Sequence, residues 1–415
     1  MLHFRKCLIA FAFVIGCSNA GTQASEIHWP GWLGPNRNGH VSPFQAPSPW
    51  PDKLRLVWQK KVGLGSGTPL VDGDRIYLHT REGEDEIVAC LDLKTGNRQW
   101  RKNYPVPYQI PSPGERYGNG PNANPAYADG RLFTFSITGI LSAWEVTTGK
   151  QLWQHTYEDH YSPTHPQWGH STSPLVDGDQ VLIHIGNEET GALVAYDASS
   201  GEEIWRDGEE GACHASPILA PFHGVRQVVE WNHEAVVGLE SQTGRRLWSY
   251  DLPHRGSNQN SPTPVFYQGR LLVGAENRGI RSLEPRLAEG QWSVVETWQH
   301  REVSLNMASA IISGDSLYGQ SHLNLGQFFR LNPLTGKVIW FGPERMGNYA
   351  TFLSTSENVF AQRVDGRLIV LKSGDDIYRP LATYKTASEE TWAAPVLLPD
   401  GLLIKDRSTL YRWRF

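Results

Sequence analysis

The sequence predicts an all-β protein: a single eight-bladed β-propeller with four strands in each blade. Three observations support this. The 415 residues include 41 Gly and 27 Pro, which is too many for a helical bundle and typical of short strands joined by tight turns. One unit of strands and turns recurs along the chain. A Trp closes most copies of that unit, at intervals of roughly 40–50 residues, which is the length of a propeller blade.

Residues 1–24 are expected to be an export signal. Arg5 and Lys6 precede an apolar run that ends at Ile15, and small and polar residues follow it, which is the pattern of a secretory signal peptide. Two cleavage sites compete. A lipobox ending at Cys17 would leave that residue lipidated, whereas a cut after Ala20 would release an unlipidated chain. We expect residues 25–51 to form an N-terminal arm and residues 52–415 to form the propeller.

The repeated unit consists of strands separated by Asp-Gly and Thr-Gly turns. Its second half reads from Cys90 to Gly96 and ends at Trp100, and its first half is clearest from Pro69 to Asp74. Asp-Gly between alternating strands favours tight hairpins. The Trp residues that mark the period are expected to be structural, because a large ring on an outer strand can bury against the next blade: Trp58, Trp100, Trp153, Trp205, Trp248, Trp298 and Trp340.

The two ends of the chain are expected to share one blade. After Tyr384 the chain has room for three strands only, whereas the strand Leu56–Lys60 has no first three strands before it. Pairing this N-terminal strand with the segment Leu410–Trp413 would close the ring and remove its exposed edges.

Charge and hydropathy exclude two classes of partner. The chain has 38 Lys and Arg against 43 Asp and Glu, a net charge of −5, and it contains no basic block that could hold nucleic acid. Its apolar N-terminal run is too short to span a membrane. We therefore expect contact with a membrane only through a lipid anchor on Cys17.

One face of the ring should carry any ligand site. In a four-stranded blade, the links between blades and the loops between second and third strands share one face. The polar and aromatic side chains there would suit a polar, planar or anionic ligand, although Asn and His also cap turns. The candidate ligand-binding residues are Arg81, Asn122, His170, His214, Asn260, Asn277, Asn306, Asn324, Asn348, Arg363, Trp392 and Arg407.

Catalytic and metal-binding signatures are sparse. Residues 155–170 contain four His, but without the compact spacing of a metal motif, so we predict no metal site and treat these His as solvated loop residues. The sequence contains neither a Gly-x-Ser-x-Gly elbow nor a phosphate-binding loop, and we assign no catalytic residue. Cys90 and Cys213 lie in separate repeats, and their spacing predicts no disulfide.

Asp92, Thr95, Gly96 and Trp100, with their copies, resemble the tryptophan-docking repeat of the quinoprotein, or PQQ-like, β-propeller family. The segment Trp29–Gly39 resembles the opening of exported PQQ-like propellers of planctomycete-type bacteria, which suggests an arm packed on the propeller. The family includes PQQ-dependent alcohol dehydrogenases and BamB-type outer-membrane assembly propellers. The resemblance implies export to the periplasm or outer membrane of a Gram-negative-type bacterium.

The expected function is that of a non-catalytic, BamB-like binding or scaffold propeller, with an unknown protein or a polar small-molecule or sugar ligand as partner. A first alternative is a quinoprotein alcohol or sugar dehydrogenase with PQQ and calcium, and a second is a polysaccharide-associated propeller. No cofactor is expected under the main hypothesis. Metal-dependent PQQ dehydrogenases typically place an adjacent Cys pair against the cofactor, which this chain lacks. Glu276, Asn277 and Asp406 are compositional candidates for calcium ligands only.

Overall fold

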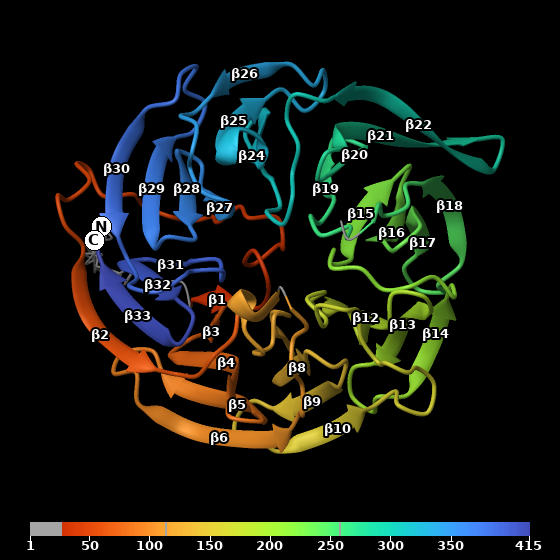
Figure 1. Cartoon of the computed structure of the whole chain (residues 1–415), viewed down its shortest axis with the longest axis horizontal. Helices are drawn as coiled ribbons and strands as arrows, with labels where there is room; N and C mark the ends of the chain where they lie inside the picture. The colour runs from red at the N-terminus through yellow and green to blue at the C-terminus, as the bar shows by residue number, and fades with distance from the viewer. Residues whose placement is uncertain (1–26, 113, 257–258) are drawn as a thin grey trace, which may run out of the picture.

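The structure is a closed ring of eight antiparallel blades around a central channel, which confirms the predicted propeller (Figure 1). Each blade has four strands, and a short strand of the N-terminal arm adds a fifth to the first blade. It is a computed structural model that describes residues 27–112, 114–256 and 259–415. The predicted signal peptide and the lipidation site Cys17 lie outside the described residues. Within the described ranges, no helix is long and apolar enough to cross a membrane.

Each of the first four blades begins with a short inner strand. The strands of blade 1 are β3 (Leu70–Asp72), β4 (Arg75–Glu82), β5 (Asp85–Asp92) and β6 (Arg98–Pro105). Those of blade 2 are β7 (Ala126–Ala128), β8 (Arg131–Phe135), β9 (Leu141–Glu145) and β10 (Gln151–His155). Those of blade 3 are β11 (Leu175–Asp177), β12 (Gln180–Gly186), β13 (Gly191–Asp197) and β14 (Glu203–Asp207). Those of blade 4 are β15 (Ile218–Phe222), β16 (Val225–Trp231), β17 (Ala235–Glu240) and β18 (Arg246–Asp251).

Blades 5 to 7 follow the same order, and blade 8 is assembled from both ends of the chain. The strands of blade 5 are β19 (Val265–Tyr267), β20 (Arg270–Ala275), β21 (Gly279–Ala288) and β22 (Gln291–His300). Those of blade 6 are β23 (Ile311–Ser313), β24 (Ser316–Ser321), β25 (Gln327–Leu331) and β26 (Val338–Phe341). Those of blade 7 are β27 (Ala350–Ser354), β28 (Asn358–Arg363), β29 (Arg367–Lys372) and β30 (Pro380–Lys385). Blade 8 holds β31 (Val396–Leu398), β32 (Gly401–Lys405), β33 (Thr409–Arg414) and β2 (Arg55–Lys61).

The ring closes as predicted. Strand β2 pairs antiparallel with β33, with Leu56 opposite Trp413 and Lys60 opposite Leu410. The buried ammonium of Lys405 at the end of β32 donates to the carbonyl of Gly65 on the link that enters blade 1. The first and last segments of the propeller are therefore joined by a strand ladder and by a side-chain contact.

Burial explains the strand sequences. The middle strands are packed on both faces by neighbouring blades, so they are rich in apolar residues, such as Val181 to Ile183 in β12, a strand that is buried throughout. The outer strands face solvent on one side, and β14 accordingly combines the buried Trp205 with exposed Glu203 and Arg206. Amphipathic alternation is thus confined to the rim of the ring.

The repeated Trp residues dock each blade against the next. Six of the seven predicted Trp donate the indole N–H to a backbone carbonyl of the following blade, and several stack on the Gly of its turn. The donor and acceptor pairs are Trp58–Leu93, Trp100–Val146, Trp153–Ala198, Trp205–Ser241, Trp298–Pro333 and Trp340–Asp375.

Trp248 is the exception among the seven. Its N–H donates to Oε1 of Gln227 in its own blade, at 2.7 Å. The neighbouring blade 5 offers no Thr-Gly turn at this place, because β21 and β22 continue as a long hairpin that turns at Glu289-Gly290. The structural role predicted for this Trp is retained, since it is buried against Phe222, but it makes no docking hydrogen bond to the next blade.

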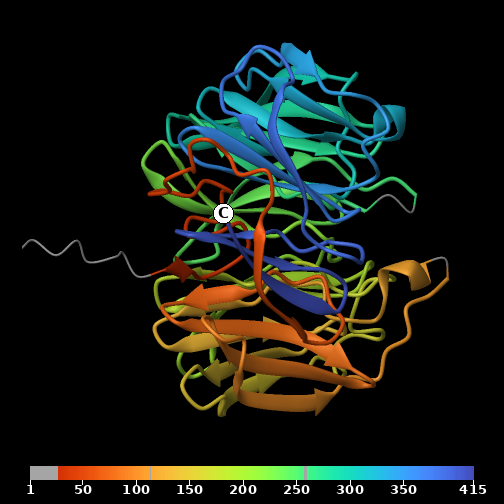
Figure 2. The same ribbon diagram turned by 90° about the vertical axis from the view of Figure 1, so that its left-hand side faces the viewer.

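The N-terminal arm crosses the face that carries the Asp-Gly turns. Strand β1 (His28–Trp29) extends blade 1 by pairing with β3, and Gly39 and Val41 bond the backbone of Ser354 in blade 7. Between these points the guanidinium of Arg37 donates to the carbonyl of Pro174 in the link that enters blade 3, at 2.7 Å. Burial lowers the pKa of Arg37 to about 10. The arm thus spans the channel on the side opposite to residues 106–112 and 114–121 (Figure 2).

Candidate functional site

A cavity of about 660 Å³ occupies the channel on the face of the inter-blade links. All eight links contribute to its wall. Trp32 and Leu33 of the arm also line it, and the same two residues line a second cavity of about 700 Å³ on the Asp-Gly side. The arm therefore forms the floor of the first cavity.

The lining of the cavity follows one rule in most links. In seven blades the residues that face it stand three positions and one position before the residue that directly precedes the inner strand, which is usually Pro. In blade 7 the corresponding pair, Tyr349 and Thr351, flanks Ala350, the first residue of β27. The two members of a pair face the same way because alternate side chains of an extended segment point to one side. The resulting pairs are Ser66 and Thr68, Asn122 and Asn124, Ser171 and Ser173, His214 and Ser216, Ser261 and Thr263, Met307 and Ser309, Tyr349 and Thr351, and Trp392 and Ala394.

The inner positions of seven pairs are joined by hydrogen bonds in an open series that runs from Ala394 through Thr68 to Ser309. Within the described residues, Oγ1 of Thr351 in the eighth pair makes no hydrogen bond. Thr68 N donates to Oδ1 of Asn124 at 2.7 Å, and Ser216 N donates to Oγ1 of Thr263 at 3.0 Å. Four further bonds have the same form: Asn124 to Ser173, Ser173 to Ser216, Thr263 to Ser309, and Ala394 to Thr68. Small polar side chains are needed there to satisfy the backbone of the neighbouring link. The side chain at the outer position makes no such repeated hydrogen bond, and its residue type differs widely from blade to blade.

Aromatic side chains dominate one side of the mouth. The ring of Trp392 lies between Tyr349 and Tyr117, with ring centroids 4.7 and 5.3 Å away. Tyr117 belongs to the short 3₁₀ helix η1 (Gly114–Tyr117), and Trp168 packs close to Gly114 from the segment that enters blade 3. The segments that enter blades 2 and 3 thus add aromatic surface to the mouth of the cavity.

Charged groups are few in this wall. Among the described lining residues, Glu276 carries the one carboxylate and Arg116 the one permanent positive charge. Burial lowers the pKa of His214 to about 4, so this imidazole is neutral at pH 7. The remaining polar lining consists of amides and hydroxyls, and the cavity is accordingly close to neutral.

Five of the twelve sequence-predicted ligand residues line the cavity. They are Asn122, His214, Asn306, Asn348 and Trp392. Asn122, His214 and Trp392 stand at the third position of the rule given above, and Asn306 and Asn348 stand one residue earlier. The period-2 alternation of an extended link was the signal that would have located Ser66, Ser171, Ser261 and Tyr349.

Three of the other predicted residues are buried outside the cavity and satisfy local backbone. Arg81 donates to the carbonyls of Gly83 and Val106, at 2.9 and 2.8 Å. His170 contacts the carbonyl of Thr164 at 3.1 Å. Asn260 donates to the carbonyl of Asn232 at 2.8 Å. These positions therefore hold loops in place.

The remaining four predicted residues lie on the same face but not in the cavity wall; Arg363 is the last residue of β28, and the other three lie between strands. Asn277 bonds His322 at 3.1 Å, and Arg363 pairs with Asp365 at 3.0 Å. Asn324 is exposed in the 3₁₀ helix η2 (Leu323–Leu325) with φ 57°, where Asn is well tolerated. Arg407 is exposed in the turn between β32 and β33.

The three candidate calcium ligands, Glu276, Asn277 and Asp406, do not converge on one site that could hold calcium and PQQ. Asn277 is engaged with His322, and the buried carboxylate of Asp406 accepts from Ser408 N, Thr409 N and the hydroxyl of Tyr411. Glu276 is left as the one carboxylate of the described wall, whereas calcium takes six to eight oxygen ligands. Cys90 and Cys213 are buried free thiols in different parts of the ring, so they form no adjacent pair.

Two relatives show the range of proteins that share this chain's sequence pattern. A quinone-dependent alcohol dehydrogenase subunit of Gluconobacter oxydans is 30% identical over 341 residues, covering 72% of this chain and 42% of the relative. The outer membrane protein assembly factor BamB of Yersinia pestis is 28% identical over 226 residues, covering 53% of this chain and 51% of the relative. The chain thus spans about half the length of these two relatives, or less.

The fold and a family model agree with these relatives. The quinohemoprotein alcohol dehydrogenase structure of Comamonas testosteroni superposes with a TM-score of 0.67 at 16% identity, covering 93% of this chain and 80% of that one. The family model described as outer membrane protein assembly factor BamB matches residues 51–110 and 84–341, which is more than half of the chain. The chain therefore belongs to the PQQ-like β-propeller family, which has both BamB-like and quinone-dependent dehydrogenase members.

Proposed function

We propose that this protein is an exported binding propeller, and that the cavity at its channel mouth takes a neutral polyhydroxylated ligand such as a saccharide. The observation that carries the proposal is the composition of the wall. Aromatic faces at Trp392, Tyr117 and Tyr349 stand beside amides and hydroxyls, with little charge. Aromatic rings stack on the apolar faces of sugars, while amides and hydroxyls bond sugar hydroxyl groups.

The same wall argues against the quinoprotein alternative. PQQ carries three carboxylates, whereas Arg116 is the one cationic side chain in the described lining, because His214 is neutral at pH 7. Several uncompensated anions in a partly buried site would be costly. We therefore favour binding over electron transfer, in keeping with the BamB-like branch of the family.

The test is a titration of the purified protein with neutral oligosaccharides by calorimetry and Trp fluorescence. We expect saturable binding that the double variant Trp392→Ala/Asn348→Ala weakens at least tenfold. Trp292→Ala is the control, because Trp292 lies on the outer hairpin of blade 5. Equal affinity of wild type and double variant would move the site away from the mouth.

A parallel titration addresses the quinoprotein alternative directly. The protein is mixed with PQQ and calcium, and absorbance and dye reduction are followed with alcohols and aldose sugars. We expect neither a spectral shift nor reduction. Stoichiometric PQQ binding with dye reduction would replace the binding hypothesis with that of a dehydrogenase.

Export is proposed from the signal-like N-terminus together with the match to an outer membrane protein assembly factor. Metabolic lipid labelling of wild type and Cys17→Ala distinguishes the two cleavage sites. Label on the wild type alone supports a lipoprotein. Absence of label on the wild type supports the cut after Ala20.

A further inference from the structure

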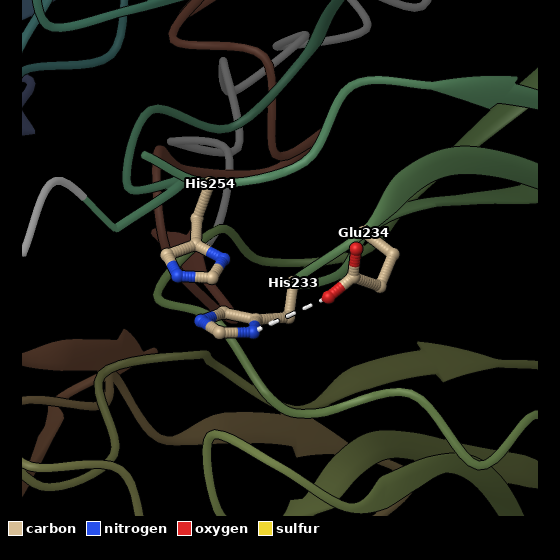
Figure 3. A group of neighbouring side chains, drawn as sticks. All are labelled: His233, Glu234 and His254. Atoms are coloured by element: carbon tan, nitrogen blue, oxygen red, sulfur yellow. Dashed lines mark ion pairs between the residues drawn. The ribbon is translucent and has the colours of Figure 1, made fainter. Parts of the chain in front are cut away.

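Two His and one Glu come together at the outer edge of the mouth face, in blade 4. His233 and Glu234 lie in the loop between β16 and β17, and His254 lies on the link after β18 (Figure 3). One candidate ligand atom of each residue lies within 4.8 Å of those of the other two. The imidazole rings are stacked with centroids 3.4 Å apart, and Nδ1 of His233 is 3.7 Å from the carboxylate of Glu234.

The backbone that carries these three side chains is held by several hydrogen bonds. Leu252 N donates to the carbonyl of Glu234 at 2.9 Å, and His254 N donates to the carbonyl of His233 at 2.8 Å. The side chain of Asn232 caps the loop by accepting from Glu234 N and Ala235 N, at 3.0 and 2.8 Å. Two separate segments are thereby fixed next to each other, so the proximity of the two His follows from the fold.

Two polar groups of the cluster are available to bind a ligand: a ring nitrogen without a hydrogen bond and an exposed carboxylate. Within the described residues, Nδ1 of His254 is buried and makes no hydrogen bond. A buried ring nitrogen without a hydrogen-bond partner costs free energy that a bound ion would recover. The Glu234 carboxylate is 58% exposed and so remains open to an incoming ion.

We propose that His233, His254 and Glu234 bind a divalent transition-metal ion such as Zn²⁺. Two imidazoles and one carboxylate form a ligand set that zinc uses, leaving a fourth position for water or a ligand. A tetrahedral ion with bonds of about 2.1 Å needs ligand atoms about 3.4 Å apart. The stacked rings must therefore rotate about their side-chain bonds so that their nitrogens converge, a movement on the order of an ångström. This site departs from the sequence expectation of no metal.

The test is a titration of the tag-free full chain with Co²⁺, whose visible absorption reports tetrahedral coordination, followed by displacement with Zn²⁺. We expect one Co²⁺ per chain. His254→Ala and Glu234→Gln should each weaken binding at least tenfold, whereas His160→Ala, which removes an exposed loop His, should leave it unchanged. Glu234→Gln alters an exposed side chain, and its unchanged thermal unfolding would show that the fold is retained.

Two results would overturn the metal site. One is the absence of a Co²⁺ absorption band at saturating ion. The other is wild-type affinity in both His254→Ala and Glu234→Gln, which would mean that the stacked pair is packing only. The Trp392→Ala/Asn348→Ala variant should bind Co²⁺ like wild type, so failure of the saccharide proposal and failure of the metal proposal are separable.

Discussion

The outer rim and the channel mouth of this ring are built from the same repeats but obey different rules. On the rim, six Trp residues make the same indole-to-carbonyl contact with the next blade. At the mouth, each link supplies two lining positions. The inner one is small and mostly polar, whereas the outer one ranges from Ser66 to Met307 to Trp392.

The difference shows which contacts the fold needs. A docking Trp completes the interface of two blades, and the inner hydroxyls and one amide of the links accept from backbone N–H groups, so both kinds of position are restricted in residue type. The side chain at the outer lining position makes no backbone contact that recurs from blade to blade. Substitutions should therefore separate into those that unfold the ring and those that change what it binds.

The largest effect is expected on the rim. Trp205→Ala removes a buried indole that stacks on Gly244 and donates to the carbonyl of Ser241, and it should cost about 4 kcal/mol of unfolding free energy. Urea unfolding followed by far-UV circular dichroism measures it. Trp292→Ala, at the half-buried hairpin of blade 5, is the matched control and should cost far less. Similar costs for the two variants would contradict the docking role.

The arm offers the next largest effect. Arg37→Met should lower the unfolding free energy by about 2–3 kcal/mol, because three buried carbonyls in the links that enter blades 3 and 4 lose a charged donor. It should also make residues 27–50 more sensitive to limited proteolysis. The control is Arg55→Met, at an exposed position of β2, which should change neither quantity. An arm that stays protected in Arg37→Met would show that its strand pairing suffices.

A pH effect of about 2 kcal/mol is expected from a loop on the mouth face. Burial lowers the pKa of His170 to about 3, against about 6.5 in the unfolded chain, so the unfolded state binds the extra proton between these values. The stabilising contribution is complete above pH 6.5 and falls by up to about 1.4 kcal/mol per pH unit as the pH drops below it. Between pH 7 and pH 5, His170→Asn should therefore lose about 2 kcal/mol less than wild type in urea unfolding. Parallel pH dependence of the two proteins would refute this assignment.

The fold was predictable because its signals are periodic. The Trp intervals and the Asp-Gly turns indicated eight blades, and the leftover strand at Leu56–Lys60 indicated how the ring closes; all of this is confirmed. The same periodicity could not show that Trp248 bonds within its own blade. That exception depends on the long hairpin of β21 and β22, whose sequence lacks the repeat turn.

The candidate site was less predictable, because its walls come from eight distant segments. Of the predicted residues, Asn122 and Trp392 line the cavity, whereas Arg81 and Asn260 bond the backbone of loops. An Asn that caps a turn and an Asn that faces a cavity look alike in sequence. The His233–His254 contact joins two loops that are separated by strands β17 and β18, so no motif spacing in the sequence predicts it.

The smallest effect on stability should fall at the residue with the largest effect on binding. Trp392 is half-buried and contacts Tyr349 and Tyr117 across the mouth, where its removal opens a surface that water can fill. Trp392→Ala should therefore lower the unfolding free energy by no more than about 1 kcal/mol, well below the cost of a buried rim Trp. If the mouth binds a saccharide, the same variant should lose at least tenfold in affinity by calorimetry. A variant that unfolds as easily as Trp205→Ala would instead place the mouth aromatics in the architecture of the ring, and the distinction between rim and mouth would fail.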